Sequence, residues 1–237
     1  MPFSNSPFVN FTRISPNKTV NRNHVIDTIT IHCVVGQVTV ERLGEIFAQT
    51  SRQASSNYGI GLDGRIGLYV EEKDRSWCSS SASNDHRAVT IEVASDTYQP
   101  YRVTDAAFDS LILLVADICK RNGIQKLIWS NNKADRINHR NGCNMTVHRD
   151  FANKACPGDY LYNRHGEIAQ RVNDKIGALP DGVRWIQVEL GPQKELREVR
   201  AALIADENYI RLRDFQDVLK VVTVSYNATT KRPTIID

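Results

Sequence analysis

Two β-branched runs constrain the fold of this chain most: VIDTITIH at residues 25–32 and RAVTIEVA at residues 87–94. Runs of Val, Ile and Thr that partly alternate with polar residues are typical of buried strands. The first run ends in His32, and the second carries Glu92 among apolar neighbours. We therefore expect a buried sheet in which His32 closes one strand and Glu92 stands on another, central strand.

Helical patterns flank these runs. Residues 38–49 place apolar side chains on one helix face, and Thr104 and Gly123 are typical start and stop signals for a helix between them. A further helix is expected over residues 159–176 and a short strand over 124–130. Together these elements predict an α/β fold with a mixed central β-sheet flanked by helices.

Residues 58–70, YGIGLDGRIGLYV, predict a β-hairpin, because Asp63-Gly64 offers the positive φ that a tight turn needs. The same stretch matches G-x-G-x-x-G, the pattern of dinucleotide-binding loops. Such a loop would have to open a helix, whereas strand-like residues 65–70 follow, so the hairpin is the better interpretation.

A stretch with Pro and Gly, residues 177–182, separates two expected domains, residues 1–179 and 180–237. The second carries nine basic and nine acidic side chains, so the formal net charge of +3 belongs to the first domain. It is expected to be a small α+β module, with strands near residues 184–190 and 221–226 and a short helix near 214–219.

Charge and hydropathy exclude several classes of protein. A net charge of +3 does not provide the basic stripe of a nucleic-acid binder. The N-terminal segment lacks the regions of a secretory signal, and the longest apolar run, residues 111–116, is far short of the ~20 residues of a membrane span. We expect no nucleic-acid or membrane partner, and a protein that stays in the cytoplasm until it is released. Five cysteines, an odd number, favour reduced thiols.

The histidines and cysteines offer one distributed metal site. Neither H-E-x-x-H nor C-x-x-C occurs, which excludes the helical zinc-protease motif and argues against a zinc finger. His32 ends a strand, and His148 and Cys156 lie eight residues apart. Three protein ligands with a fourth position left for water are typical of catalytic zinc. A strand-end histidine and a single cysteine are also common structural residues, so the spacing alone leaves both interpretations open.

Five segments resemble, in order, the zinc-dependent N-acetylmuramoyl-L-alanine amidases of the amidase-2 type, a family that includes phage lysins and peptidoglycan-recognition proteins. They are ITIHC, SSNYGIGLDGRI, RSWCSS, VTIEVA and VHRDFANKACPGD, and they cover about residues 25–160. The resemblance implies the fold of that family and one Zn²⁺, held by His32 and by His148 and Cys156 of an H-x7-C-P-G segment.

The resemblance also implies two catalytic residues. Glu92 would shuttle a proton from water to the leaving amine, and Lys154 would stabilise the oxyanion of the tetrahedral intermediate. The alternatives are a solvent-facing glutamate and an ordinary surface lysine. Ser56 stands where many members have a tyrosine, which favours Glu92 as the shuttle. Tyr58 and Trp77 are candidates for substrate contact, each with core packing as its alternative.

The other cysteines and histidines have structural interpretations. Cys78 stands where the family often has a histidine and is expected to line the cleft without binding metal. Cys33 should point to the opposite face of its strand from His32. The remaining expectations are unpaired thiols at Cys33, Cys119 and Cys143, and surface or capping positions for His24, His86 and His165.

The C-terminal module resembles the small module named after the copper amine oxidase N-terminal domain, which implies wall attachment or self-association into a homo-oligomer. The whole chain is predicted to hydrolyse bacterial peptidoglycan at the amide between N-acetylmuramic acid and the L-alanine of the stem peptide, as a phage or prophage endolysin. The alternatives are a bacterial autolysin and a non-catalytic peptidoglycan-recognition module of the same fold. Non-catalytic relatives commonly lack a metal ligand, whereas His32, His148 and Cys156 are all present.

Overall fold

The computed structural model of the chain describes residues 3–177 with their side chains and the backbone of five strands beyond them. Those strands are β9 (Val183–Leu190), β10 (Glu195–Ile204), β11 (Glu207–Ile210), β12 (Thr223–Asn227) and β13 (Arg232–Ile236). The internal contacts divide the chain into two compact units, Met1–Ala178 and Leu179–Asp237.

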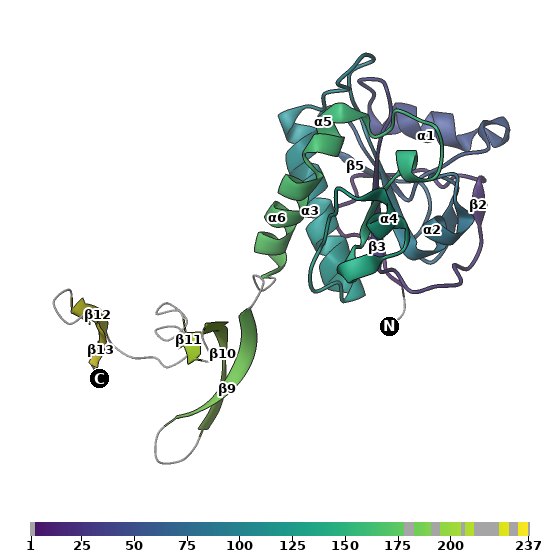
Figure 1. Cartoon of the computed structure of the whole chain (residues 1–237). Coiled ribbons are helices and arrows are strands. Elements are labelled where there is room, and N and C mark those ends of the chain that lie inside the picture. The colour runs from purple at the N-terminus through teal and green to yellow at the C-terminus, as the bar shows by residue number, and fades with distance from the viewer. Residues whose placement is uncertain are drawn as a thin grey trace. The chain divides into compact units, whose positions relative to one another are not determined.

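A six-stranded mixed sheet with the order β1-β5-β4-β7-β3-β8 forms the centre of the first unit (Figure 1). Its strands are β1 (Phe11–Thr12), β3 (Thr28–Cys33), β4 (Tyr58–Ile60), β5 (Ile66–Leu68), β7 (Ala88–Val93) and β8 (Met145–Val147). β4 and β5 pair antiparallel, and the other neighbours pair parallel. The expected mixed central sheet is therefore confirmed. Its two β-branched runs lie side by side, with His32 opposite Glu92.

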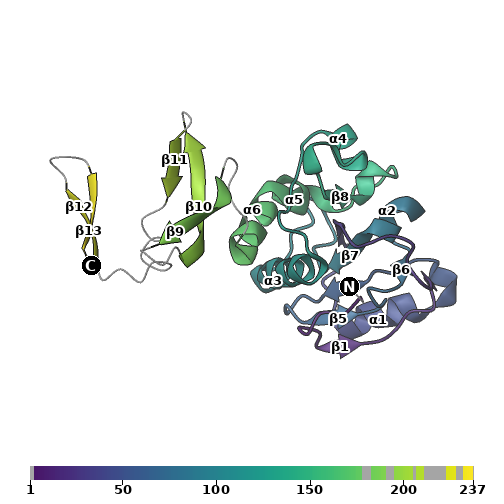
Figure 2. The same cartoon turned by 90° about the horizontal axis from the view of Figure 1, so that it is seen from below.

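Helices cover both faces of this sheet. α3 (Asp105–Asn122) and α6 (His165–Ile176) pack against each other on one face (Figure 2). α1 (Val40–Ala48) and α2 (Ala82–Arg87) lie on the other face. The shorter elements are α4 (Lys133–Ile137), α5 (Gly158–Asn163) and the 3₁₀ turns η1 (Thr50–Arg52), η2 (Arg140–Gly142) and η3 (His148–Asp150). No helix among the described residues has both the length and the apolar character that a membrane span needs.

The two faces of the sheet differ in chemistry because side chains alternate along each strand. One face packs on α3 and forms the main core, with Ile29, Ile31, Val89 and Ile91 among its members. On the other face, the hydroxyls of Thr30 and Thr146 lie 2.7 Å apart, and each bonds to Asn84 of α2 at 3.0 and 2.9 Å. His32 and Glu92 stand on this polar face, so the fold sets them apart from the hydrophobic core.

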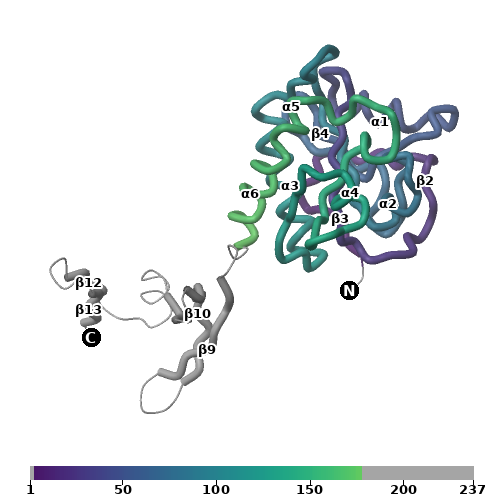
Figure 3. Tube along the Cα trace, in the orientation of Figure 1, coloured from purple at the N-terminus to yellow at the C-terminus, as the bar shows by residue number. Residues whose placement is uncertain are grey.

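The N-terminal segment runs along the outside of the first unit (Figure 3). β1 pairs with β5, and β2 (Lys18–Thr19) pairs with β6 (Arg75–Ser76). Arg22 follows, and its buried guanidinium donates hydrogen bonds of 2.7–3.1 Å to five backbone carbonyls, those of Glu72, Asp74, Asp85, His86 and Ala88. These contacts make the segment part of the folded unit.

Several sequence predictions are confirmed. α3 begins after the Thr104 side chain, which accepts the N–H of Ala107, and it ends at Gly123 in the left-handed conformation. The hairpin is formed by β4 and β5, and Gly64 has the expected positive φ, of 84°. An added Cβ at Gly64 would also lie 2.8 Å from the carbonyl oxygen of Ala106, so no other residue fits there without a shift.

Two predictions were wrong. Residues 124–130 form no strand, because the N–H groups of Leu127 and Ile128 bond to side-chain oxygens of Asn173 and Asn144 instead of to a neighbouring strand. The helix expected over 159–176 is split into α5 and α6 at Arg164, whose φ and ψ of −100° and 4° are not helical.

The described part of the second unit is made of strands. β11, β10 and β9 form an antiparallel sheet in that order, and β12 pairs antiparallel with β13. The strands expected near residues 184–190 and 221–226 correspond to β9 and β12, whereas β10, β11 and β13 were not expected. The predicted helix near residues 214–219 lies outside the described residues.

Candidate metal centre

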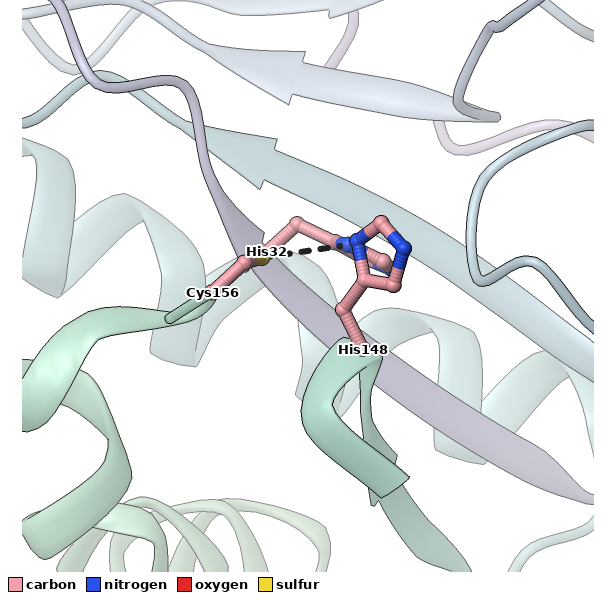
Figure 4. Close-up of side chains that lie close together, drawn as sticks. All are labelled: His32, His148 and Cys156. Atoms are coloured by element: carbon pink, nitrogen blue, oxygen red, sulfur yellow. Dashed lines mark hydrogen bonds between the residues drawn. The ribbon is translucent and has the colours of Figure 1, made fainter. Parts of the chain in front are cut away.

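Three side chains from distant parts of the sequence meet where parallel strands end (Figure 4). β3 and β8 are neighbours, with Ile31 opposite Val147. His32 comes directly after Ile31 and His148 directly after Val147, so the two histidines stand next to each other. Cys156 reaches the same place from the loop before α5. One ligand atom from each of the three residues lies within 4.8 Å of the others.

The separations within this cluster are short. The Sγ of Cys156 lies 3.4 Å from Nδ1 of His32, and the His32 and His148 rings have centroids 5.1 Å apart. The loop between His148 and Cys156 is closed by a hydrogen bond, 3.2 Å long, from the Arg149 N–H to the Cys156 carbonyl. Gly158 follows with a φ of 78°, and an added Cβ there would lie 2.7 Å from Tyr101. The glycine of the C-P-G segment is thus required by the way this loop turns.

The donor set fits a zinc ion. Two imidazoles and a thiolate are ligands that zinc prefers, and three protein ligands with water in the fourth position are typical of catalytic zinc. His32 is fully buried, and its Nε2 has no hydrogen-bond partner in the structure. Burial, followed by the nearby His148 ring, holds the pKa of His32 well below its ordinary value. Burial, followed by the charge of Lys154, lowers the pKa of His148. Both rings are therefore neutral at pH 7, which is the form that binds metal.

Glu92 lies beside the cluster, on the strand next to His32. Its Oε1 is 3.9 Å from Sγ of Cys78, and its Oε2 is buried without a hydrogen-bond partner. Burial, followed by the Cys33 thiol, raises the pKa of Glu92 well above its ordinary range. His32, Cys78 and Glu92 form a second group whose ligand atoms lie within 4.8 Å of one another. The structure thus places Glu92 inward and Cys78 in the site's wall.

Cys33 lies close enough to the candidate metal centre to interact with one of its ligands. It packs in the main core, on the opposite face of β3 from His32, as expected. Because it is the last residue of β3, its thiol nevertheless interacts with Cys156. The hydrogen bond with Cys33, together with burial, raises the pKa of the Cys156 thiol. Two thiols therefore lie together at the edge of the site.

Lys154 and Trp77 lie near the surface. The Lys154 side chain is exposed, and its charge acts on His148. Trp77 is half-buried, and its indole N–H donates to Oγ1 of Thr19 at 3.0 Å. The roles expected for these two residues remain predictions.

Tyr58 was wrongly considered for substrate contact. It is fully buried, and its hydroxyl donates to Oε1 of Glu72 at 2.7 Å and accepts the N–H of Ser6 at 2.8 Å. Gly59, not Tyr58, is the register partner of Glu92. Strand alternation therefore turns Tyr58 to the face opposite Glu92, where it packs in the core.

His165 is also not the surface or capping residue that was expected. It is fully buried, its Nδ1 lies 2.7 Å from the carbonyl oxygen of Leu161, and its ring lies 4.4 Å from the Trp129 ring, measured between centroids. Burial lowers the pKa of His165 to about 4.

Sequence reasoning missed the residues that hold His148. Ser80, with a φ of 65°, places its Oγ 3.0 Å from Nε2 of His148. Asp150 accepts the N–H of Val147 at 3.1 Å and is paired with the buried Arg136. No motif marks Ser80, and Arg136 stands in a polar stretch of the sequence that also holds Arg140 and Arg149.

The fold and the site define an α/β protein with a candidate metal centre at the carboxyl edge of a mixed sheet. Residues 22–159 match the Amidase_2 family, described as N-acetylmuramoyl-L-alanine amidase. This match spans more than half of the chain, and the chain belongs to that family.

Solved structures show the same fold. The N-acetylmuramoyl-L-alanine amidase LysC from Clostridium intestinale URNW superposes with a TM-score of 0.52 at 19% identity, over 71% of this chain and 99% of LysC. The endolysine N-acetylmuramoyl-L-alanine amidase LysCS from the same organism gives a TM-score of 0.52 at 20% identity, over 72% of this chain and 98% of LysCS. No sequence among curated proteins matches the chain significantly.

Proposed function

We propose that the protein is a zinc-dependent N-acetylmuramoyl-L-alanine amidase, which hydrolyses the amide between N-acetylmuramic acid and the L-alanine of the peptidoglycan stem peptide. The observation that carries this proposal is the convergence of His32, His148 and Cys156 within 4.8 Å. Membership of the Amidase_2 family supports it, and so do the amidase names of LysC and LysCS, nearly all of whose length is covered.

His32, His148 and Cys156 would hold the ion. Two neutral imidazoles and one thiolate leave the site with a net charge of about +1, and zinc held this way polarises a scissile carbonyl and acidifies a water. Ser80 and Asp150 orient His148, since Ser80 contacts its ring and Asp150 fixes the backbone just before it. Second partners of this kind raise metal affinity by holding a ligand in place.

Glu92 would move the proton. Its Oε2 is buried and has no partner, and its strand position is opposite His32. The positive charge of a bound zinc ion would favour the ionised form of Glu92 over the protonated form that burial favours. The carboxylate would then accept a proton from the attacking water and return it to the leaving amine. Lys154, on the loop between two ligands, would stabilise the negative charge on the carbonyl oxygen. Trp77 offers a half-buried ring for contact with the substrate.

The biological setting proposed is that of a phage or prophage endolysin, held in the cytoplasm and acting on the cell wall after release. The second unit would attach the protein to the wall or pair two copies of it.

Turbidity of purified cell walls tests the activity. Cleavage should clear the walls and release L-alanine amino groups without reducing sugars, chelation should abolish it, and zinc should restore it. Glu92→Gln should reduce turnover strongly while one zinc per chain is retained. Cys156→Ser should lose zinc, whereas the matched substitution Cys119→Ser, in the core face of α3, should keep it. Release of reducing sugars would identify a glycosidase instead, and wall binding without cleavage would identify a recognition module.

A further inference from the structure

A hollow of about 380 Å³ adjoins the metal centre. It is lined by Lys133 of α4 and by residues 149–154, most of the loop between His148 and Cys156. α4 packs against η3, which begins at His148, and against β8, which ends just before it (α4 and β8 in Figure 2). The hollow therefore lies on the loop that joins two candidate ligands.

The hollow is cationic. Lys133 and Lys154 are both exposed, and within the described residues 3–177 neither pairs with a carboxylate. The Lys133 ammonium donates one long hydrogen bond, of 3.5 Å, to the carbonyl oxygen of Arg149, which leaves its charge unneutralised. Arg149 adds a third positive charge, and its Nε is buried without a hydrogen-bond partner. Its Nη2 lies 3.3 Å from the exposed carboxylate of Asp159, a contact that solvent screens.

No acidic side chain that lines the hollow is available to neutralise these charges. Asp150 is the one acidic residue that lines the hollow. Its fully buried carboxylate is held by the Arg136 guanidinium, with Nε to Oδ2 at 3.0 Å and Nη2 to Oδ1 at 2.5 Å. The positive charge of Lys133, which no carboxylate of the hollow balances, therefore favours an anion from outside the protein.

The chemistry of the substrate identifies that anion, so this inference rests on the proposed function. In the glycan strand, the lactyl carboxyl is consumed in the scissile amide and the N-acetyl sugars are neutral. The nearest carboxylate in the stem is the α-carboxylate of the second residue, a glutamate linked through its γ-carboxyl. One extended residue spans roughly 3.3–3.6 Å, so this carboxylate lies within one or two residue lengths of the scissile amide. That distance suits a hollow on the loop between two ligands.

We propose that Lys133 binds this α-carboxylate, so that the protein discriminates stem peptides with a free second-residue carboxylate from those in which it is amidated. The hollow then sets the orientation of the stem, with the peptide over residues 149–154 and the sugar on the other side of the metal centre. Lys133 acts in specificity and not in the chemical step.

Two synthetic muropeptides test the proposal: N-acetylmuramoyl-L-alanyl-D-isoglutamate and the corresponding isoglutamine. Their dissociation constants are measured by calorimetry on the metal-free full chain, where no turnover occurs. We expect the free acid to bind about three- to tenfold more tightly, as exposed charge pairs contribute modestly. Lys133→Ala should reduce this preference to near unity, and added salt should weaken it. Lys120→Ala, an exposed lysine on α3, serves as the matched control and should leave the preference intact.

Cleavage by the zinc-loaded chain is followed separately. The KM values should reproduce the preference, and kcat should differ little, because the contact is made equally before and during the reaction. Equal dissociation constants, or a preference that survives Lys133→Ala, would overturn the carboxylate site. A preference in binding without any cleavage would contradict the proposed activity and leave the carboxylate site standing.

Discussion

The ion pair between Arg136 and Asp150 positions a candidate metal ligand, and Arg136→Leu measures how strongly. Both side chains are almost fully buried, at 2% and 0% exposed, and they form two parallel hydrogen bonds. A third bond runs from Nη1 of Arg136 to the carbonyl oxygen of Ser130, 2.7 Å long. Asp150 in turn fixes the N–H of Val147, the residue before His148.

The expected cost follows from burial. Removing the guanidinium leaves a carboxylate in the interior without its counter-charge, which costs about 3–5 kcal/mol in the free energy of unfolding. For a domain of this size, that lowers the melting temperature by about 6–20 °C. The guanidinium also stacks 4.4 Å from the centroid of the Trp129 ring, and leucine replaces only the apolar part of this contact. Because His148 loses its support, zinc affinity should fall by about 10–100-fold.

Urea unfolding followed by circular dichroism, with a zinc titration of the folded variant, checks both effects. The double substitution Arg136→Leu/Asp150→Asn should be more stable than Arg136→Leu alone, since it buries no unpaired charge. Arg171→Ala is the control, because its pair with Asp109 is exposed and worth less than about 1 kcal/mol. A loss below about 1 kcal/mol for Arg136→Leu, or unchanged zinc affinity, would refute the reasoning.

Three further outcomes are expected. His165 has a pKa of about 4 in the folded protein, against about 6.5 in the unfolded chain. Its effect on stability is therefore absent above pH 7, and the free energy of unfolding decreases as the pH falls from about 6.5 to 4. The free energies of unfolding from urea titrations at pH 7.5 and 4.5 should differ by about 2.5 kcal/mol less in His165→Gln than in the unsubstituted protein. Tyr58→Phe should lower stability by about 1–3 kcal/mol, because Glu72 loses a buried donor, without affecting wall cleavage. Zinc at about a thousandfold excess over its dissociation constant should stabilise the protein by about 4 kcal/mol in thermal scans, and Cys156→Ser should abolish that gain.

The strands and the long helix were predictable because local chemistry determines them. The β-branched runs of β3 and β7 and the end signals of α3 act over a few residues. The order of the strands was not predictable, because it depends on contacts between segments far apart in the sequence. Residues 124–130 illustrate the limit: their composition suits a strand, but Asn144 and Asn173 take the backbone bonds that a strand would need.

The candidate ligands were found by spacing and resemblance, and the structure brings all three together. Their supports were not found. Arg136 is one of several arginines in a polar stretch of the sequence, and its partner Asp150 comes from a separate element, so no local pattern indicates the ion pair. Tyr58 was misjudged for a related reason: its environment is set by Glu72 and Ser6, which only the fold places beside it.

β1 is the outermost strand of the central sheet, next to β5. It lies outside residues 22–159, the part shared with the family, and covers the outer edge of β5. A strand edge with free N–H and C=O groups is a template for another chain. A protein shortened to the shared residues would expose that edge and the apolar strand behind it. A segment outside the family match therefore covers a sheet edge that could otherwise pair with another chain and aggregate.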